Sequence, residues 1–321
     1  MEKFYLGETT NMFEQFKKHI NEDAAVLQKV VLPNTNNNVN VYLKREDLLH
    51  PIISGNKWRK LKYNLVEAKE KKHKTILTFG GAFSNHIHAT AGAGKIFGFN
   101  TIGVIRGEEH LPLNPTLKDA TEFGMKIHYV SRSDYRKKTE RKFIKMLHQK
   151  FGDFYLVPEG GTNNLAVKGG TEIVQDINID FDYIVSACGT GGTLAGVICG
   201  LEENKKAIGI SALKGAGFLK EKITEYVKEY SGKAYNNWQI KLDYHFGGFA
   251  KTKPEQITYM KEFEKLNNIL LDPIYTSKMI YGIYDMIIKG EIENGSTVIA
   301  LHTGGLQGRR GKENILNEIN Q

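Results

Sequence analysis

Short apolar runs of strand length alternate with longer stretches of helical period through most of the chain. This alternation predicts parallel β-sheets that are covered by helices on both faces. The predicted strands are Thr75–Phe79, Thr101–Ile105, Lys126–Val130, Tyr155–Val157, Tyr183–Ala187, Ala207–Ile210 and Thr297–Leu301, with Val41–Leu43 as a possible additional strand. The predicted helices are Lys57–Lys71, Asn85–Phe97, Asn114–Phe123, Asp134–Gln149, Asn164–Ile177, Thr193–Leu201 and Lys253–Leu266.

The length of 321 residues favours one large domain or two closely joined ones. The sequence contains no repeat and no linker-like segment, so a second domain is expected to be inserted or wrapped by both termini. No apolar run reaches the roughly 20 residues that a membrane span requires. The segment Met1–Asn21 lacks the apolar core of a signal peptide. We therefore expect a cytoplasmic protein that does not bind membranes.

The net charge of +8 suits an anionic cofactor and a small anionic substrate. In stretches such as Glu67–Lys74 and Lys220–Lys233 the lysines are interleaved with glutamates, a pattern that argues against nucleic-acid binding. The two cysteines, Cys188 and Cys199, lie in apolar surroundings and form no CxxC pair. They predict neither a disulfide nor a metal site, and we interpret them as small core residues.

The segment Ser54–Leu61 places a lysine where a helix is expected to start. Ser54-Gly55-Asn56 supplies loop and capping residues, so that Lys57 falls in the first turn. The positive end of the helix dipole there lowers the pKa of an amine and favours the neutral form that imine formation requires. The alternative is that Lys57 is one of several solvated lysines on a basic helix.

Two further segments have the pattern of a strand, then glycines, then a helix. In Thr78–His86 a glycine pair precedes a helix capped by Ser84 or Asn85, whose first amides are suited to a carboxylate. Alternatively, this is an ordinary cap, with His86 and His88 on a polar helix face. The run from Gly189 to Thr193 suits a monophosphate, because glycines let several amides converge and Thr190 and Thr193 add hydroxyls; Gly191 and Gly192 complete the run. It matches neither a P-loop nor a dinucleotide fingerprint.

Near the C-terminus, two segments complete the pattern. Asp272–Lys278 contains Tyr275 and Thr276, and the second segment, His302-Thr303-Gly304-Gly305, follows a predicted strand. Thr303 thus lies where strand-end site residues are found in α/β sheets. Each segment taken alone is also compatible with a simple turn.

Together and in this order, these segments resemble the family of 1-aminocyclopropane-1-carboxylate deaminase and D-cysteine desulfhydrase, from about Tyr42 to Gly305. The most specific element is Gly55-Asn56-Lys57 followed by Arg59-Lys60-Leu61. The resemblance implies an α/β, two-domain fold of the tryptophan synthase β-subunit type (fold type II), with three-layer αβα domains and mainly parallel sheets. We expect residues 1–59 and 171–321 to form a large domain and residues 60–170 a small inserted one, with the cofactor, pyridoxal 5′-phosphate, between them. The family also implies a homodimer.

The resemblance assigns a role to each matching position. Lys57 is expected to hold the cofactor as a Schiff base and to move the α-proton of the substrate. Ser84, with the amides of Asn85 and His86, is expected to bind the substrate carboxylate. The remaining expected contacts are Asn85 with the phenolic oxygen of the cofactor, Gly189, Thr190, Gly191, Gly192 and Thr193 with its phosphate, Thr303 with its ring nitrogen, and Tyr275 and Thr276 with the substrate.

The same positions separate the two activities of the family. The cyclopropane deaminases have Glu after the tyrosine and Leu in the final His-x-Gly-Gly, whereas this chain has Thr276 and Thr303. A hydroxyl beside the ring nitrogen cannot keep it protonated as a carboxylate does, and this favours expulsion of a β-substituent. We therefore expect D-cysteine desulfhydrase-type elimination to pyruvate, ammonia and sulfide, with cyclopropane deamination as the alternative. Phe249 departs from the family, which usually has tyrosine there.

Other function classes remain as alternatives at this point. A dinucleotide-dependent oxidoreductase is disfavoured because the fingerprint is missing. The remaining alternatives are a protein that holds pyridoxal phosphate without turnover and a basic binding module. The colour of the cofactor and product assays would distinguish both from an enzyme. The substrate in every enzymatic case is expected to be a small amino acid.

Overall fold

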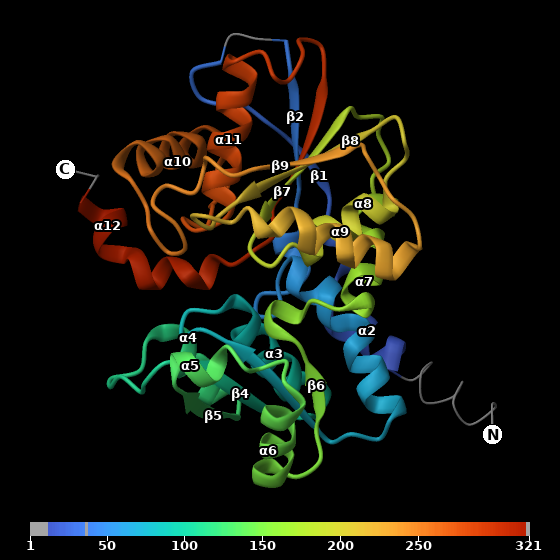
Figure 1. Cartoon of the computed structure of the whole chain (residues 1–321). Coiled ribbons are helices and arrows are strands. Elements are labelled where there is room, and N and C mark those ends of the chain that lie inside the picture. The colour runs from blue at the N-terminus through green and yellow to red at the C-terminus, as the bar shows by residue number, and fades with distance from the viewer. Residues whose placement is uncertain (1–11, 36–37, 319–321) are drawn as a thin grey trace.

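The chain folds into two lobes, each built around one β-sheet (Figure 1). The structure is a computed structural model that describes residues 12–35 and 38–318. The remaining residues of the predicted large domain, 1–11, 36–37 and 319–321, lie outside the described residues, as does the first half of Met1–Asn21. Within the described part, no helix is both long and apolar enough to cross a membrane.

The larger sheet combines strands from both ends of the chain. Its order is β1-β2-β10-β7-β8-β9, and all neighbours are parallel except β1 and β2. The late strand β10 lies between early β2 and central β7, with Val298 opposite both Val41 and Tyr183. The strands are β1 (Leu27–Val30), β2 (Asn40–Lys44), β7 (Tyr183–Cys188), β8 (Lys206–Ser211), β9 (Trp238–Lys241) and β10 (Thr297–Leu301).

Helices cover both faces of this sheet. Val185 and Ile210 belong to a buried cluster with α10 and α11, whereas Ile184 and Ala207 belong to a second cluster with α7, α8 and α9. Because side chains alternate across a strand, these neighbouring residues mark opposite faces. The helices are α7 (Asn164–Gln175), α8 (Gly192–Gly200), α9 (Phe218–Ser231), α10 (Pro254–Asn267) and α11 (Thr276–Ile288).

The smaller sheet is entirely parallel, in the order β5-β4-β3-β6. Leu77 and Val104 pack in a buried cluster with α5 and α6, and Ile105 packs in another with α3 and α4. This sheet also has helices on both faces, so the predicted three-layer α/β architecture is confirmed. The elements are β3 (Thr75–Gly80), β4 (Asn100–Arg106), β5 (Met125–Val130), β6 (Tyr155–Val157), α3 (Asn85–Phe97), α4 (Pro115–Glu122), α5 (Arg132–Tyr135) and α6 (Arg141–Phe151).

The predicted helix Asp134–Gln149 is wrong in one respect, because it is broken into α5 and α6. The break lets Lys138 approach Glu159, with 3.3 Å between Nζ and Oε2, while the Tyr135 hydroxyl donates to the same carboxylate at 2.7 Å. Both contacts join residues more than 20 positions apart. The periodicity of apolar residues within 134–149 therefore could not reveal that the helix is interrupted.

The elements that were not predicted include β1, β9, α9 and α11. Strands β1 and β9 are the two edges of the larger sheet, and their sequences LQKV and WQIK are too short and too polar to stand out. The sequence of α9 is rich in charge, yet three of its apolar residues are buried against the sheet: Leu219, Ile223 and Val227.

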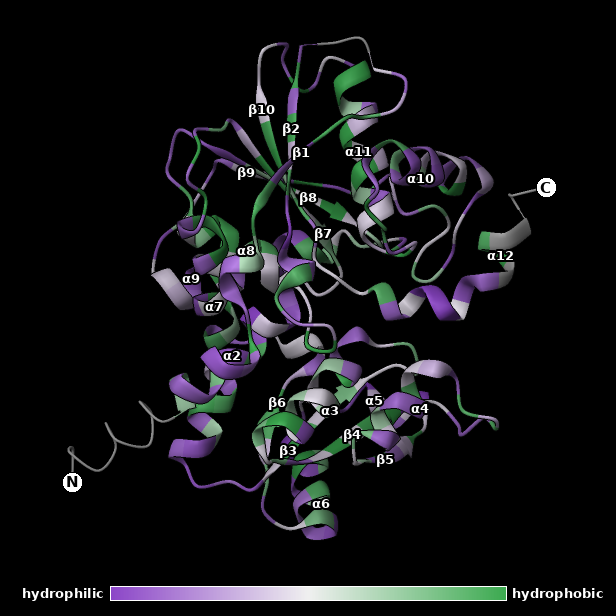
Figure 2. Ribbon diagram, turned by 180° about the vertical axis from the view of Figure 1, so that it is seen from behind, coloured by the Kyte–Doolittle hydropathy of each residue, from purple (hydrophilic) through white to green (hydrophobic). Residues whose placement is uncertain are grey.

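The two sheets separate cleanly along the sequence. All strands of the smaller sheet lie within residues 60–170, and all strands of the larger sheet lie outside that range. Helices α2 (Asn56–Glu70) and α7 occupy the region between the sheets (Figures 1 and 2). The exact domain boundaries stay a prediction. Short helical elements complete the chain: η1 (Glu22–Ala24), η2 (Glu46–Leu48), η3 (Glu159–Gly161), η4 (Leu306–Lys312) and α12 (Glu313–Glu318).

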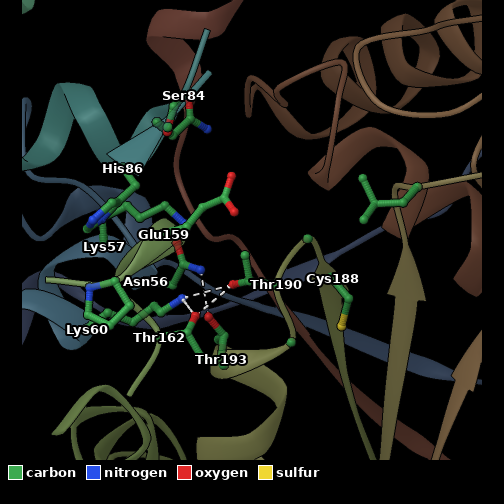
Figure 3. A pocket seen from close by; sticks show the side chains of 18 of the residues that line it. Asn56, Lys57, Lys60, Ser84, His86, Glu159, Thr162, Cys188, Thr190 and Thr193 are labelled. Carbon is green, nitrogen blue, oxygen red and sulfur yellow. Dashed lines mark hydrogen bonds between the residues drawn. The ribbon is translucent and has the colours of Figure 1, made fainter. Parts of the chain in front are cut away.

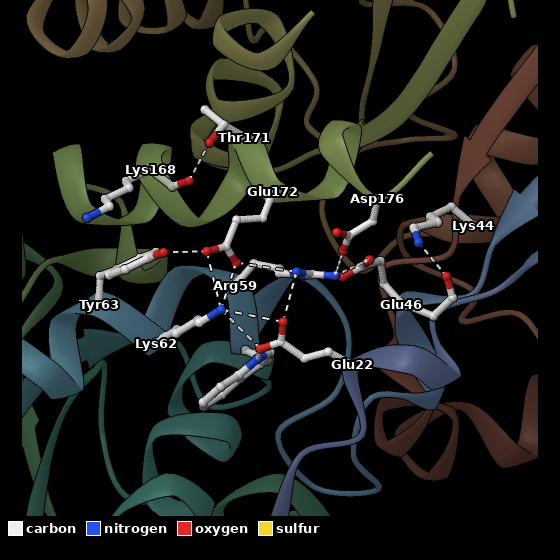
Figure 4. Close-up of polar contacts among 12 residues, drawn as sticks. Glu22, Lys44, Glu46, Arg59, Lys62, Tyr63, Lys168, Thr171, Glu172 and Asp176 are labelled. Atoms are coloured by element: carbon white, nitrogen blue, oxygen red, sulfur yellow. Dashed lines mark hydrogen bonds and ion pairs between the residues drawn. The ribbon is translucent and has the colours of Figure 1, made fainter. Parts of the chain in front are cut away.

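A buried arginine fixes the start of α2 (Figure 4). The Arg59 side chain is 1% exposed, and its guanidinium donates to both oxygens of Glu46, from Nε at 2.9 Å and from Nη2 at 3.1 Å. The same guanidinium reaches Asp176 at 2.7 Å and Glu172 at 3.3 Å. Bidentate pairing of this kind restricts orientation as well as distance. The network therefore ties α2 to η2 and to the C-terminal end of α7.

Candidate active site

A cavity of about 640 Å³ lies between the two lobes, at the carboxyl ends of strands from both sheets. Its wall includes the first residues of α2, α3 and α8 and the residues that follow β7 and β10. Figure 3 shows Lys57 of α2, Ser84 before α3 and Thr193 of α8 around it. In open α/β sheets this is where ligands bind. Of the predicted site residues, the cavity brings together Lys57, Ser84, Asn85, His86, Gly189, Thr190, Gly191, Gly192, Thr193, Tyr275 and Thr303.

Lys57 is the second residue of α2 and lies in its first turn, as predicted. The N-cap is Gly55, within the predicted segment Ser54-Gly55-Asn56; no side chain caps the helix, and Asn56 donates to Thr193 at 2.7 Å. Gly55 has a φ of +63°, and a Cβ there would lie 2.0 Å from the carbonyl oxygen of Thr303. Only glycine allows this close approach. It places the start of α2 directly against the strand-end loop of β10.

Burial lowers the pKa of Lys57 to about 8, although the Asp272 carboxylate opposes part of the change. Desolvation disfavours the ammonium form, because the charge loses its hydration. The neutral amine is therefore accessible near neutral pH. This is the property that a lysine needs in order to condense with an aldehyde.

The glycine loop joins the end of β7 to the start of α8. Gly191 is the N-cap of α8 with a φ of +83°, and a Cβ on Gly192 would lie 2.6 Å from a carbon of Thr162. The loop thus lies close to its neighbours. Gly191 and Gly192, which precede Thr193, have no side chains that could shield the first backbone amides of α8. Free amides at a helix start attract anions. The geometry suits a phosphate.

Lys60 is a site residue that the sequence reasoning missed. Its buried Nζ donates to the hydroxyls of Thr162 at 2.8 Å and Thr190 at 3.4 Å, and these hydroxyls lie 2.8 Å apart (Figure 3). Burial, with the repulsion of Lys57, holds the pKa of Lys60 well below its usual value. A bound anion would restore the charge of this amine. The spacing of three from Lys57, which puts both on one helix face, was the available signal.

The start of α3 forms another wall of the cavity. Ser84 is the N-cap, and its Oγ accepts a hydrogen bond from the amide of Ile87 at 3.3 Å, as predicted. The interpretation of His86 and His88 as polar-face residues is wrong, because they are 1% and 3% exposed. The carboxamide of Asn85 faces the cavity wall and accepts a hydrogen bond from Gln307 at 2.9 Å.

The His86 side chain is neutral and singly protonated. Thr78 donates to the carbonyl of Val157 at 2.8 Å, so its hydroxyl oxygen is left to accept from Nε2 of His86 at 2.8 Å. Burial, together with the nearby charges of Lys57 and Lys60, holds the pKa of His86 well below its usual value. The Nδ1 atom therefore carries a lone pair. It has no partner among the described residues.

Tyr275 lines the cavity, but Thr276 does not. The Thr276 hydroxyl is fully buried and donates to the Asp272 carboxylate at 2.9 Å. That carboxylate also accepts the amides of Ile274, Tyr275 and Thr276, each within 2.9 Å. Thr276 thus contacts the Asp272 carboxylate rather than the cavity.

The Tyr275 phenol lies against the glycine loop, since a Cβ on Gly189 would be 3.2 Å from its hydroxyl. Burial raises the pKa of Tyr275, and the charge of Asp272 raises it further. The phenol therefore stays protonated across the physiological range. Phe249 also lines the cavity, with its ring centroid 6.2 Å from that of Tyr275.

These residues fit pyridoxal phosphate. An amine with a lowered pKa for the aldehyde, a glycine cradle with a buried lysine for the phosphate, and a strand-end hydroxyl all border one cavity. No group of metal-ligating side chains is assembled within residues 12–35 and 38–318.

Comparison with known proteins points the same way. Residues 27–304 match the family model described as "Pyridoxal-phosphate dependent enzyme". A protein of Pyrococcus furiosus named as a putative 1-aminocyclopropane-1-carboxylate deaminase is 34% identical over 293 residues, covering 86% of this chain and 88% of the relative. A mitochondrial protein of Arabidopsis thaliana, named as a bifunctional D-cysteine desulfhydrase/1-aminocyclopropane-1-carboxylate deaminase, is 29% identical over 86% of this chain and 75% of its own.

A solved structure described as an ACC deaminase homologue superimposes with a TM-score of 0.80 at 28% identity. The match covers 96% of this chain and 98% of that one. The predicted fold type is therefore confirmed.

Proposed function

This chain belongs to the family of pyridoxal-phosphate-dependent enzymes that includes 1-aminocyclopropane-1-carboxylate deaminases and D-cysteine desulfhydrase, and we propose that it eliminates the β-substituent of a small D-amino acid. D-Cysteine is the proposed substrate, and elimination of its sulfur followed by hydrolysis with one water gives pyruvate, ammonia and sulfide. Deamination of 1-aminocyclopropane-1-carboxylate to 2-oxobutyrate and ammonia is the second candidate, supported by the names of the relatives.

Residues that line the cavity would supply the contacts to the cofactor. Lys57 would hold its aldehyde carbon, and the amides and hydroxyls of 189–193 together with Lys60 would hold its phosphate. Asn85 would donate to its phenolic oxygen, and Thr303 would face its ring nitrogen. When bound, the cofactor withdraws electrons from Cα of an amino acid joined to it.

The start of α3 would bind the substrate carboxylate. The Ser84 hydroxyl and the first amides of α3, those of Asn85 and His86, lie at the positive end of a 13-residue helix. A carboxylate is stabilised there by the dipole and by amides that have no partner within the helix. Gly80 and Gly81 carry no side chains into the same part of the cavity.

Two side chains would handle protons. Lys57, with its lowered pKa, would accept the proton from Cα of the substrate at Nζ. The protonated Tyr275 phenol would donate a hydrogen bond to the sulfur that leaves Cβ with the electron pair of the broken bond. Asp272 keeps Tyr275 in place because it holds the amide of that residue at 2.9 Å.

The single observation that carries the choice of reaction is the hydroxyl of Thr303 in the cavity wall. Glu159 is the one acidic side chain among the described lining residues, and Tyr135 and Lys138 already engage it. A ring nitrogen without a carboxylate partner holds its proton less strongly. Expulsion of a good leaving group tolerates this loss better than opening of a cyclopropane does.

The test is a parallel product assay on the cofactor-loaded protein. D-Cysteine should yield pyruvate and sulfide in equal amounts, with little product from L-cysteine and little 2-oxobutyrate from the cyclopropane substrate. The Lys57→Ala variant should lose the visible absorbance and the activity. Formation of 2-oxobutyrate as the main product would instead assign the protein to cyclopropane deamination, and pyruvate from D-serine without sulfide from D-cysteine would change the proposed leaving group.

The Phe249→Tyr variant examines the departure from the family. It restores a second phenol 6.2 Å, centroid to centroid, from Tyr275. If Phe249 tunes the choice of substrate, the variant changes the ratio of the two product rates. An unchanged ratio would show that Tyr275 alone supplies the phenol that the reaction uses.

A further inference from the structure

The side chain of Gln307 contacts the cavity residue Asn85 across the two lobes. Gln307 lies in η4, shortly after Thr303, and its Nε2 donates to Oδ1 of Asn85 at 2.9 Å. The two residues are 222 positions apart in the sequence. The bond therefore exists only when the C-terminal segment rests against the start of α3.

This hydrogen bond decides which end of the Asn85 carboxamide is a donor. With Oδ1 occupied by Gln307, Nδ2 is the group left for the opposite side. A Cβ on Gly305 would lie 2.5 Å from that Nδ2, so the glycine makes room for the amide beside the loop that carries Thr303. If the Asn85 carboxamide alone turned over, its Nδ2 would face the Nε2 of Gln307, and two hydrogen-bond donors would oppose each other.

The segment that carries Gln307 is anchored on both lobes. Arg309 donates to Glu264 of α10 in the larger lobe, and Arg310 forms an ion pair with Asp119 of α4 in the smaller lobe. Asp119 also accepts from Nε2 of His88 at 3.0 Å, and His88 lies three residues after Asn85 on α3. These contacts fix the position of the Gln307 side chain relative to the start of α3.

We propose that Gln307 is a positioning residue that orients Asn85 so that its Nδ2 donates to the phenolic oxygen of the cofactor. The inference rests on the proposed function, because it gives Asn85 the cofactor contact described above. A donor at that oxygen stabilises its ionised form, which absorbs visible light, over the neutral phenol, which absorbs in the near ultraviolet. Loss of the donor therefore shifts the ratio of the two bands.

Two substitutions separate donor orientation from charge. Gln307→Met keeps the length of the side chain and removes its polarity, so that Asn85 is free to rotate. Gln307→Glu offers only acceptors, so that Nδ2 of Asn85 turns toward residue 307. Gln149→Glu, on the exposed surface of α6, makes the same chemical change far from the cavity and serves as the control.

The experiment records the absorption spectra of the cofactor-loaded proteins between pH 6 and 10. Full loss of a hydrogen bond to a charged oxygen predicts a shift of roughly tenfold in the band ratio toward the near ultraviolet for Gln307→Glu. Gln307→Met should shift it in the same direction by a smaller factor, and Gln149→Glu should match the wild type.

A Gln307→Met spectrum identical to that of the wild type would overturn the inference, even if Gln307→Glu differs, since charge alone would then explain the change. A wild-type protein that stays colourless with added pyridoxal phosphate would overturn both this inference and the proposed function. The two failures are therefore distinguishable.

Discussion

The pH dependence of cofactor capture tests the electrostatics of Lys57 directly. With a pKa of about 8, roughly one-tenth of the amine is neutral at pH 7, whereas about one three-thousandth is neutral at the ordinary value of 10.5. Only the neutral amine attacks an aldehyde. Lys57 should therefore condense with pyridoxal phosphate roughly 300-fold faster at pH 7 than an ordinary lysine of equal nucleophilicity.

The Asp272→Asn variant perturbs this pKa in a known direction. The Asp272 carboxylate raises the pKa of Lys57 against the larger effect of burial. Removing its charge should lower the pKa of Lys57 further, because the ammonium form loses its nearby anion. Capture at pH 7 should become faster, and the pH of half-maximal capture should fall. Asparagine retains the oxygen that accepts from the amides of Ile274 and Tyr275.

The assay mixes cofactor-free protein with pyridoxal phosphate at a series of pH values and follows the rise of the visible band. Wild type and variant are compared at each pH, so that ionisation of the free cofactor cancels. Lys278→Met is the matched control, since burial lowers the pKa of Lys278 to about 8 as well, and its amine binds the carbonyls of His245 and Gly248. A wild-type midpoint near 10.5, or an upward shift in Asp272→Asn, would refute the reasoning.

Three further predictions concern stability and cofactor retention. The pKa of Lys57 is lower in the folded than in the unfolded chain, so the unfolded state binds more protons between pH 8 and 10.5, and the cofactor-free wild type should gain stability as the pH rises through that window. The Lys57→Met variant should be more stable than the wild type at pH 7. Urea unfolding at pH 7 and at pH 10 measures both effects. Lys60→Met should weaken binding of pyridoxal phosphate but leave that of unphosphorylated pyridoxal unchanged in absorbance titrations, and an equal loss for both would contradict a phosphate contact. Arg59→Met should lower the free energy of unfolding by about 3–5 kcal/mol because it leaves Glu46 buried and unpaired, whereas Asp176→Asn, at an exposed partner, should cost about 1 kcal/mol or less.

Much of the fold followed from local patterns. All seven predicted strands, and the additional one at Val41–Leu43, are present within one or two residues of their predicted ends. Buried parallel strands are continuous apolar runs between turn residues, so sequence alone marks them. The strands β1 and β9 escaped this rule because each has only four residues and two of the four are polar.

The candidate site likewise has features that the sequence predicted and features that it did not. The positions of Lys57 and Ser84 at helix starts and of Thr303 after a strand were readable, because capping and strand ends depend on neighbours in the chain. The direction of a side chain was not readable. Thr276 was expected in the site, but its hydroxyl turns to Asp272 instead.

The sequence by itself determined the alternation of strands and helices, the glycine loop and the lysine in the first turn of α2, because short-range sterics and hydrogen bonding decide these features. Only the tertiary structure decided that Lys60 meets Thr162, that α5 and α6 separate, and that Gln307 reaches Asn85. These contacts join positions that are remote in the chain, and whether they form depends on how the two sheets and their helices pack. Packing is a property of the whole fold, and no local pattern encodes it.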